Sequence, residues 1–191
     1  MGRNPDTNAE QRAETRQLLM RAGLELFADR GLERTTVDAI AANAGCSKGL
    51  VYHYFPNKRA LAEAVLADWV EQVAAVAAGS DVVEAPDERL AAFATAMAAH
   101  IEANPDSYRL NLRALTDPEL RELAGELTAD RAGPDHPWAD AFALAGSESP
   151  DLDGRLFHAS LLGIFAHHAL SPHPTPLADL VERLIELTLD R

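Results

Sequence analysis

Residues 35–58, TTVDAIAANAGCSKGLVYHYFPNK, decide the fold of this chain because they predict two short helices joined by a tight turn. Thr35 or Thr36 can cap the first helix, and Gly45 ends it. The apolar residues of this helix recur at helical spacing: Val37, Ile40, Ala41 and Ala44. The first helix is therefore only about two turns long.

The second helix, SKGLVYHYF, has the length of a helix that reads the major groove of DNA. Ser47 can cap its start, and Pro56 closes it because the residue before a proline disfavours helix. We expect Val51 and Phe55 to face supporting helices. The outward and N-terminal faces then carry Lys48, Gly49, Leu50, Tyr52, His53 and Tyr54. Two short helices joined by a glycine-containing turn are the form of a helix-turn-helix, which is a DNA-binding unit.

Helices are expected on both sides of this unit. Residues 16–30 place their apolar side chains on one helix face, and Gly31 ends that helix. The polar residues 1–15 are expected to form a flexible tail. Further helices are expected over residues 58–79, 88–103, 151–170 and 176–190, and from Pro105 and Pro118 onward. Residues 132–150 have the composition of a long connection with one short helix.

The sequence therefore predicts an all-α fold. It comprises an N-terminal three-helix helix-turn-helix DNA-binding domain over residues 16–60 and a C-terminal helical domain over residues 61–191. With 47% hydrophobic residues, a chain of 191 residues can build a proper core.

Charge is distributed unevenly along the chain. The whole chain has a formal charge of -13, yet residues 1–60 contain nine Arg and Lys against seven Asp and Glu. Only this N-terminal part is suited to approach phosphate, whereas the acidic remainder would discourage indiscriminate binding to nucleic acid.

The single cysteine, Cys46, excludes an internal disulfide and favours a reducing compartment. We expect it to be a structural residue of the turn rather than a redox-sensing thiol. The N-terminal residues are too polar for a signal peptide, and no stretch approaches the ~20 apolar residues of a membrane span. A cytoplasmic protein that does not bind membranes is expected.

The stretch from Arg16 to about Leu61 resembles the tetracycline-repressor (TetR) family of bacterial transcription regulators. The resemblance runs through LFADRG, TTVDAIAANAG, SKG, VYHYF and PNK, and beyond residue 62 it rests on length and all-helical layout. It implies a homodimer with one helix-turn-helix per subunit and a C-terminal domain for regulation and dimerisation. It also implies a repressor that releases its double-stranded DNA operator when a small-molecule effector binds. No cofactor is expected.

Carried over residue by residue, the DNA contacts of the family fall on Thr36, Ser47, Lys48, Gly49, Tyr52, His53, Tyr54 and Lys58. Leu50 departs from the family pattern, in which this position is often polar. It either contacts a thymine methyl group or plays no part in base choice.

An effector pocket in the C-terminal domain would have a largely apolar lining, drawn from Phe93, Met97, His100, Tyr108, Leu112, Trp138, Phe142, Phe157 and Leu161. Such a lining suits a hydrophobic or aromatic molecule with one or two polar groups. His100 falls in an almost wholly apolar helix, so its imidazole needs a polar partner, either a protein group or the effector.

The last two expected helices have the composition of a four-helix dimer interface, although packing within one chain would also account for it. The interface would draw on Ala159, Gly163, Ala166, Leu177, Leu180, Val181 and Leu184.

Other classes of function receive little support from the sequence. The motifs GxSxG, HExxH and GxGxxG and a Walker-type loop are missing, so an enzyme is not expected. No metal site is expected because the C-terminal histidines lack ligand spacing: His158, His167, His168 and His173. The remaining alternative is a DNA-binding regulator whose C-terminal domain only dimerises or binds a protein partner.

Overall fold

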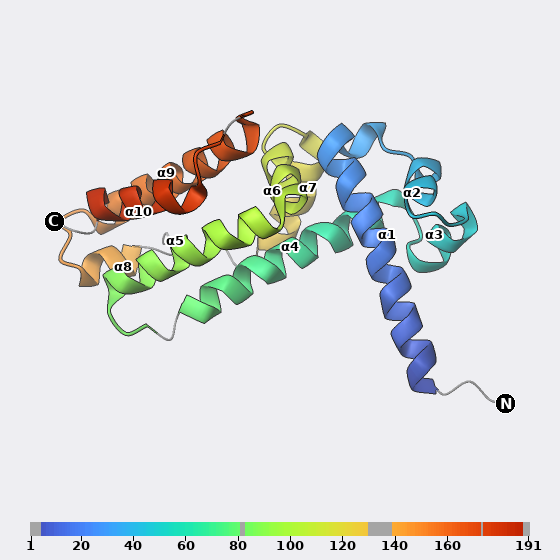
Figure 1. Cartoon of the computed structure of the whole chain (residues 1–191), viewed down its shortest axis with the longest axis horizontal. Helices are drawn as coiled ribbons and strands as arrows, with labels where there is room; N and C mark the ends of the chain where they lie inside the picture. Colours follow the sequence, from blue (N-terminus) through green and yellow to red (C-terminus); the bar gives the residue numbers. More distant parts are fainter. Residues whose placement is uncertain (1–4, 81–82, 130–138, 173, 189–191) are drawn as a thin grey trace. The chain divides into compact units, whose positions relative to one another are not determined.

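The computed structural model describes residues 5–80, 83–129, 139–172 and 174–188. All regular secondary structure in these ranges is helical (Figure 1). The helices are α1 (Pro5–Arg34), α2 (Val37–Asn43), α3 (Lys48–Tyr54), α4 (Lys58–Ser80), α5 (Pro86–Ala103), α6 (Pro105–Ala114), α7 (Pro118–Thr128), α8 (Ala139–Leu144), α9 (Pro150–Leu170) and α10 (Leu177–Thr188). The predicted all-α fold is thus confirmed. None of the helices in these ranges has the length and apolar character needed to cross a membrane.

The first helix differs from its expected start. It begins at Pro5 rather than Arg16, so residues 5–15 are helical and do not form a flexible tail. This segment lacks apolar periodicity, which is the signal that sequence analysis relies on. Pro5 at the first helical position, a following acidic residue and a run of Ala, Glu, Gln and Arg favour the helix instead.

The chain packs as two units, each with its own interior. The first contains the chain up to Trp69 together with Arg109–Leu127, and the second contains Val70–Tyr108 and the chain from Thr128 onward. The first unit therefore extends past the boundary expected at residue 60. The helices α4 and α6 each contribute residues to both units.

The core of the first unit holds the helix-turn-helix in place. Phe27 of α1, Ile40 of α2 and Leu61 of α4 are completely buried. Val51 and Phe55 are only 2% and 4% exposed, which confirms that this face of α3 packs on the supporting helices. Burial of such side chains contributes about 1.5–3 kcal/mol each.

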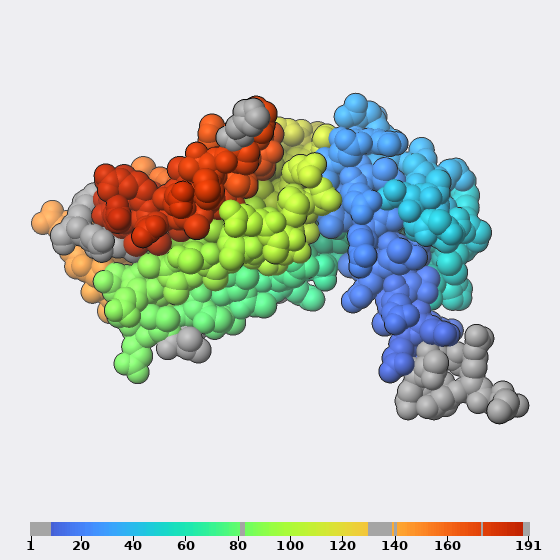
Figure 2. Space-filling view, in the orientation of Figure 1, coloured from blue at the N-terminus to red at the C-terminus, as the bar shows by residue number. Residues whose placement is uncertain are grey.

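In the second unit, α10 packs against α5 and α9, and α8 packs against α9. Figure 2 shows α10, in red, lying along the green surface of α5. Aromatic rings meet in its interior: Phe142 and Phe157 are 5.9 Å apart between ring centroids, as are Tyr108 and Phe165.

Helix α1 contains a sharp turn at Gly31. Gly31 has φ 80° and ψ 171°, a backbone conformation that side-chain-bearing residues rarely adopt. The buried hydroxyl of Thr35 donates to the carbonyl of Gly31 at 2.7 Å and to that of Leu26 at 3.2 Å. The turn thereby aims the chain from α1 into α2, with its carbonyls satisfied by a side chain.

Two residues far along the chain bind the same turn. The guanidinium of Arg113 donates to the carbonyls of Ala28 at 3.0 Å and Asp29 at 2.7 Å. A carboxylate oxygen of Asp117 accepts from the amide of Leu32 at 3.3 Å. Helices α6 and α7 are therefore attached to α1 through the groups that its C-terminal end leaves unsatisfied.

Replacing Gly31 with alanine should destabilise the protein strongly. The new Cβ would lie 2.9 Å from the Asp117 carboxylate oxygen, in addition to the strained backbone. We expect Gly31→Ala to lower the free energy of unfolding by about 2–4 kcal/mol in urea denaturation. Gly45→Ala is the matched control, because Gly45 also has positive φ but its Cβ would meet no described atom within 4 Å. It should cost only about 1–2 kcal/mol, and equal losses in the two variants would contradict this account of the turn.

Candidate nucleic-acid interface

The two short helices are set by local capping. The hydroxyl of Thr36 accepts from the amide of Ala39 at 3.2 Å, and that of Ser47 accepts from the amide of Leu50 at 3.2 Å. Both residues are exposed at the first turns of α2 and α3. Thr36 rather than Thr35 is the cap, since Thr35 is buried at the Gly31 turn.

The turn between α2 and α3 depends on Gly45. It adopts φ 64°, and the amide of Cys46 donates to the carbonyl of Ala41 at 2.9 Å. Cys46 is half-buried and packs against the core, as expected of a structural residue.

The outer surface of α3 is polar and aromatic. Lys48, Gly49, Tyr52 and His53 are exposed, and Tyr52 keeps 47% of its surface in contact with solvent. Leu50 is half-buried, so it offers only part of its side chain to that surface. We call the exposed face formed by Thr36, Ser47, Lys48, Gly49, Tyr52 and His53 the recognition surface. DNA contact by these residues remains a prediction.

Lys48 forms an exposed ion pair with Asp38. Its ammonium nitrogen lies 2.8 Å from a carboxylate oxygen of Asp38. This hydrogen bond, and next the attraction between the charges, raises the pKa of Lys48 above its usual value. The ammonium is fully charged at neutral pH, and a phosphate must compete with Asp38 for it.

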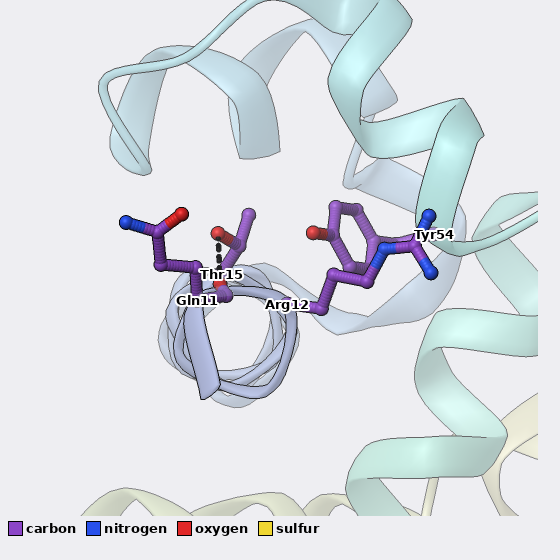
Figure 3. A pocket seen from close by; sticks show the side chains of 4 residues that line it. All are labelled: Gln11, Arg12, Thr15 and Tyr54. Carbon is purple, nitrogen blue, oxygen red and sulfur yellow. Dashed lines mark hydrogen bonds between the residues drawn. The ribbon is translucent and has the colours of Figure 1, made fainter. Parts of the chain in front are cut away.

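Tyr54, the last residue of α3, differs from the other predicted DNA contacts. It is half-buried, and its ring meets the ring of His53 edge to face at 5.2 Å. Together with Gln11, Arg12 and Thr15 of α1 it lines an open hollow (Figure 3). Sequence reasoning missed the α1 residues because they fall in the segment that was expected to be a flexible tail.

Lys58 has a structural role that the sequence did not predict. The expectation was a phosphate contact, but its ammonium donates to the carbonyls of Leu32 at 2.5 Å and Glu33 at 3.2 Å. The carbonyls that follow the break in α1 need donors, and the side chain at the start of α4 supplies them. Lys58 therefore binds the Gly31 turn in this structure, and its contact with phosphate remains a prediction.

The residues expected to line an effector pocket divide between the units. Those buried in the second unit are Phe93, Met97, Tyr108, Phe142, Phe157 and Leu161. Leu112 lies in the first unit, because α6 passes from one unit to the other, and Trp138 lies outside the described residues. Burial raises the pKa of Tyr108, so its hydroxyl stays neutral at physiological pH.

His100 is half-buried, and the side chain of Asn104 lies beside its ring. Its Nδ1 lies 3.4 Å from the amide nitrogen of Asn104, which also donates to the His100 carbonyl at 2.9 Å. Among the described residues no group of three or more His, Cys, Asp or Glu is arranged to hold a metal ion; His173 lies outside them.

Two of the residues predicted for the dimer interface are packed inside the chain itself. Leu177 and Val181 are 0% and 1% exposed, because α10 packs against α5 and α9 of the same chain. They are not available to a partner, and their assignment to the interface is corrected. Leu180, Leu184 and Ala166 are half-buried, whereas Ala159 and Gly163 are exposed.

Helix α9 instead presents a longer apolar stripe, spaced alternately by four and three residues. It consists of Leu152, Leu156, Ala159, Gly163, Ala166 and Leu170. The three leucines are 57%, 57% and 78% exposed. Their spacing was available in the sequence, but only burial shows that this face of α9 is turned away from the chain's own core.

Similarity in sequence to known proteins is found in the N-terminal region of the chain. The family model described as bacterial regulatory proteins, tetR family, matches residues 19–65, which include α2 and α3. A stretch of 67 residues, 35% of this chain, is 43% identical to the HTH-type transcriptional repressor KstR2 of Mycolicibacterium smegmatis. That stretch covers 32% of the relative, so the chain spans about a third of the length of this relative.

Solved structures resemble most of the chain. The transcriptional regulator FadR from Bacillus subtilis, in complex with stearoyl-CoA, has a TM-score of 0.70 at 15% identity over 91% of this chain and 97% of that one. The ketosteroid transcriptional regulator KstR2 of Mycobacterium tuberculosis has a TM-score of 0.72 at 21% identity over 92% and 93% of the two chains. At these identities the likeness shows the fold alone. The helix-turn-helix region, residues 19–65, is therefore that of the tetR family of bacterial regulatory proteins, and most of the chain shares the fold of these solved regulators.

Proposed function

We propose that this protein is a sequence-specific DNA-binding transcriptional regulator, a repressor released from a palindromic operator by a small hydrophobic effector. The observation that carries this proposal is the anchoring of α3. Val51 and Phe55 fix the helix in the core, while Lys48, Tyr52 and His53 face solvent. A helix presented in this way can enter the major groove of B-DNA, which is about 12 Å wide.

Within this proposal, some residues of the recognition surface contact phosphate and others contact bases. The capped starts of α2 and α3, at Thr36 and Ser47, direct amides and partial positive charge toward phosphate. Lys48 adds a full charge next to them, and Gly49 lets the backbone come close. Tyr52 and His53 project from the outer face of α3 and are the candidates for contact with base edges.

The ion pair between Lys48 and Asp38 leads to a paired prediction. Lys48→Ala should weaken operator binding and make the slope of log affinity against log salt about 0.9 less steep, because one phosphate contact is lost. Asp38→Asn should instead tighten binding at low salt, since it frees the ammonium and removes a negative charge near phosphate. Fluorescence anisotropy with a labelled operator measures both, and an unchanged slope in Lys48→Ala would exclude it as a phosphate ligand.

We propose that the protein acts as a homodimer through α9 and α10. The stripe from Leu152 to Leu170 is apolar, exposed and spaced for packing against another helix. An added Cβ at Gly163 would meet no described atom within 4 Å, so a partner helix can approach closely there. Two helices from each subunit would complete a four-helix interface.

Leu156→Glu tests this interface without disturbing the chain's own core, because Leu156 is 57% exposed. We expect monomers in light scattering and DNA binding weakened at least tenfold, since one subunit reaches only one half-site. Leu144→Glu is the matched control: Leu144 is 75% exposed but lies on α8, outside the stripe. A monomeric wild type, or a dimeric Leu156→Glu variant, would rule out the interface.

The effector is proposed to enter the apolar interior of the second unit. Three helices supply its aromatic and aliphatic side chains: Phe93 and Met97 from α5, Phe142 from α8 and Phe157 from α9. Such a lining accepts a bulky apolar molecule with few polar groups. The stearoyl chain of the stearoyl-CoA in the Bacillus subtilis structure and the ketosteroid in the name of the Mycobacterium tuberculosis regulator are apolar groups of this kind.

Thermal melting in the presence of acyl-CoA thioesters, steroids and small polar metabolites tests the effector proposal. A ligand bound by the folded state alone adds about 2.7 kcal/mol of stability at a hundred times its Kd, so Tm should rise with concentration. We expect this for an acyl or steroid compound and not for the polar ones. No rise in any case would favour the alternative, in which the C-terminal part only dimerises or binds a protein partner.

Release of the operator requires that effector and DNA oppose each other. An effector lowers the affinity for DNA only as far as it prefers the conformation that does not bind DNA. By linkage, a saturating operator should weaken effector binding by the same factor, about 5- to 150-fold for typical couplings. Calorimetric titration of the effector with and without operator measures this factor, and equal affinities would exclude allosteric release.

A further inference from the structure

We infer that Arg12, Tyr54 and Gln11 form a binding subsite for one backbone phosphate of the operator, beside the end of the recognition helix. The inference rests on the proposed function, since it requires that α3 binds DNA. It adds a contact from α1 that lies outside the recognition surface.

The subsite is a hollow between two helices of the first unit. It measures about 450 Å³ and is lined by Gln11, Arg12 and Thr15 of α1 and by Tyr54, the last residue of α3. Residues 11, 12 and 15 share one side of α1 because positions four apart are neighbours on a helix. In Figure 3 the hydroxyl of Tyr54 points toward Thr15, the Arg12 side chain runs alongside the Tyr54 ring toward α3, and Gln11 extends on the other side of Thr15.

The lining has the chemistry of an anion site. Arg12 contributes a permanent positive charge and five N–H donors, Tyr54 a hydroxyl and Gln11 an amide. Thr15 donates its hydroxyl proton to the Gln11 carbonyl at 2.8 Å, so it forms the floor rather than a donor. None of the four lining residues is acidic.

A second hollow in the same unit differs from the first because its lining contains both arginines and carboxylates. It measures about 480 Å³, and its arginines are accompanied by carboxylates: Arg30, Arg34 and Arg113 with Glu33, Asp117 and Glu119. Arg113 and Asp117 are already bonded to the backbone at the Gly31 turn. Charge in that hollow is balanced by the protein, whereas charge in the Arg12 hollow is left for an anion to balance.

Packing holds the Tyr54 ring, and a neighbouring contact holds α1 beside the end of α3. The ring of Tyr54 is partly buried against the core and packs edge to face on His53. One turn after Arg12, the Arg16 guanidinium lies over the Phe55 ring, 5.2 Å from its centroid. This contact attaches α1 to the residue that ends α3 and so fixes the Arg12 side of the hollow. Prior ordering of this kind lowers the entropic cost of binding.

Operator phosphate is the anion that this location favours. A helix in the major groove is flanked by phosphate backbones on both sides, and residues next to its end face one of them. Arginine, tyrosine and glutamine are among the side chains that make such contacts, which fix the register of the protein without reading sequence.

The experiment uses the full chain and an operator recovered by selection from genomic fragments. Single phosphates of one half-site are replaced, position by position, with neutral methylphosphonates. Affinities are measured for the wild type, Arg12→Ala, Tyr54→Phe and Arg21→Ala. Arg21 is the matched control because it is exposed on the same helix nine residues on, which places it on the opposite side of α1. Circular dichroism checks that every variant keeps its helices.

We expect Arg12→Ala to bind operator and random DNA more weakly by the same factor, with a salt slope about 0.9 less steep. The ratio of the wild-type affinity for DNA to that of Arg12→Ala should therefore fall by roughly 3.5-fold between 50 and 200 mM salt. One methylphosphonate position should weaken the wild type and Arg21→Ala but leave Arg12→Ala unchanged, and Tyr54→Phe should show a partial loss at the same position.

The inference is overturned if Arg12→Ala keeps the wild-type salt slope, or if every methylphosphonate weakens Arg12→Ala as much as the wild type. Either result would leave the proposed function intact, because the wild type would still bind its operator. A wild type that selects no DNA at all would overturn the proposed function and this subsite together.

Discussion

The turn at Gly31 is the constraint on which the first unit depends. The chain must leave the α1 helix there with positive φ, and the carbonyls around the break need donors. They receive them from the hydroxyl of Thr35, the ammonium of Lys58 and the guanidinium of Arg113, while Asp117 accepts an amide of the turn. Lys58 belongs to α4, Arg113 to α6, and Asp117 directly precedes α7, so one turn connects the helices that support the helix-turn-helix.

Under the proposed function, the same turn also connects the helices through which an effector would act. Helix α4 starts at Lys58 in the first unit and continues into the second, and α6 starts in the second unit and reaches Arg113 in the first. Each of these helices is bonded to the Gly31 turn through one side chain. Under the proposed function, a change of α4 or α6 within the second unit acts on the turn that orients α2 and α3. Such a change shifts DNA affinity only if the effector prefers one arrangement over the other.

The sequence predicted most where local chemistry decides the structure. The caps Thr36 and Ser47, the burial of Val51 and the helix starts at proline follow from short-range rules, and the structure has them. Contacts between distant residues were out of reach. Asp117 and Leu32 are 85 positions apart, so the sequence around either residue does not predict their hydrogen bond.

Two kinds of error follow from the same cause. Residues 5–15 have no apolar period, so the helix that positions Arg12 lacked the signal on which the sequence analysis relied, although its proline start and its helix-forming residues favour it. Leu177 and Val181 do have an apolar period, but the pattern does not say whether a helix packs on its own chain or on a partner, and α10 packs here on α5 and α9.

Hydrogen exchange of the full chain, with and without a selected operator, tests the central claim that α3 and its supports form the DNA interface. The account predicts slower amide exchange at the starts of α2 and α3 and at residues 11–16; an unchanged α3 with protection confined to the second unit would contradict it.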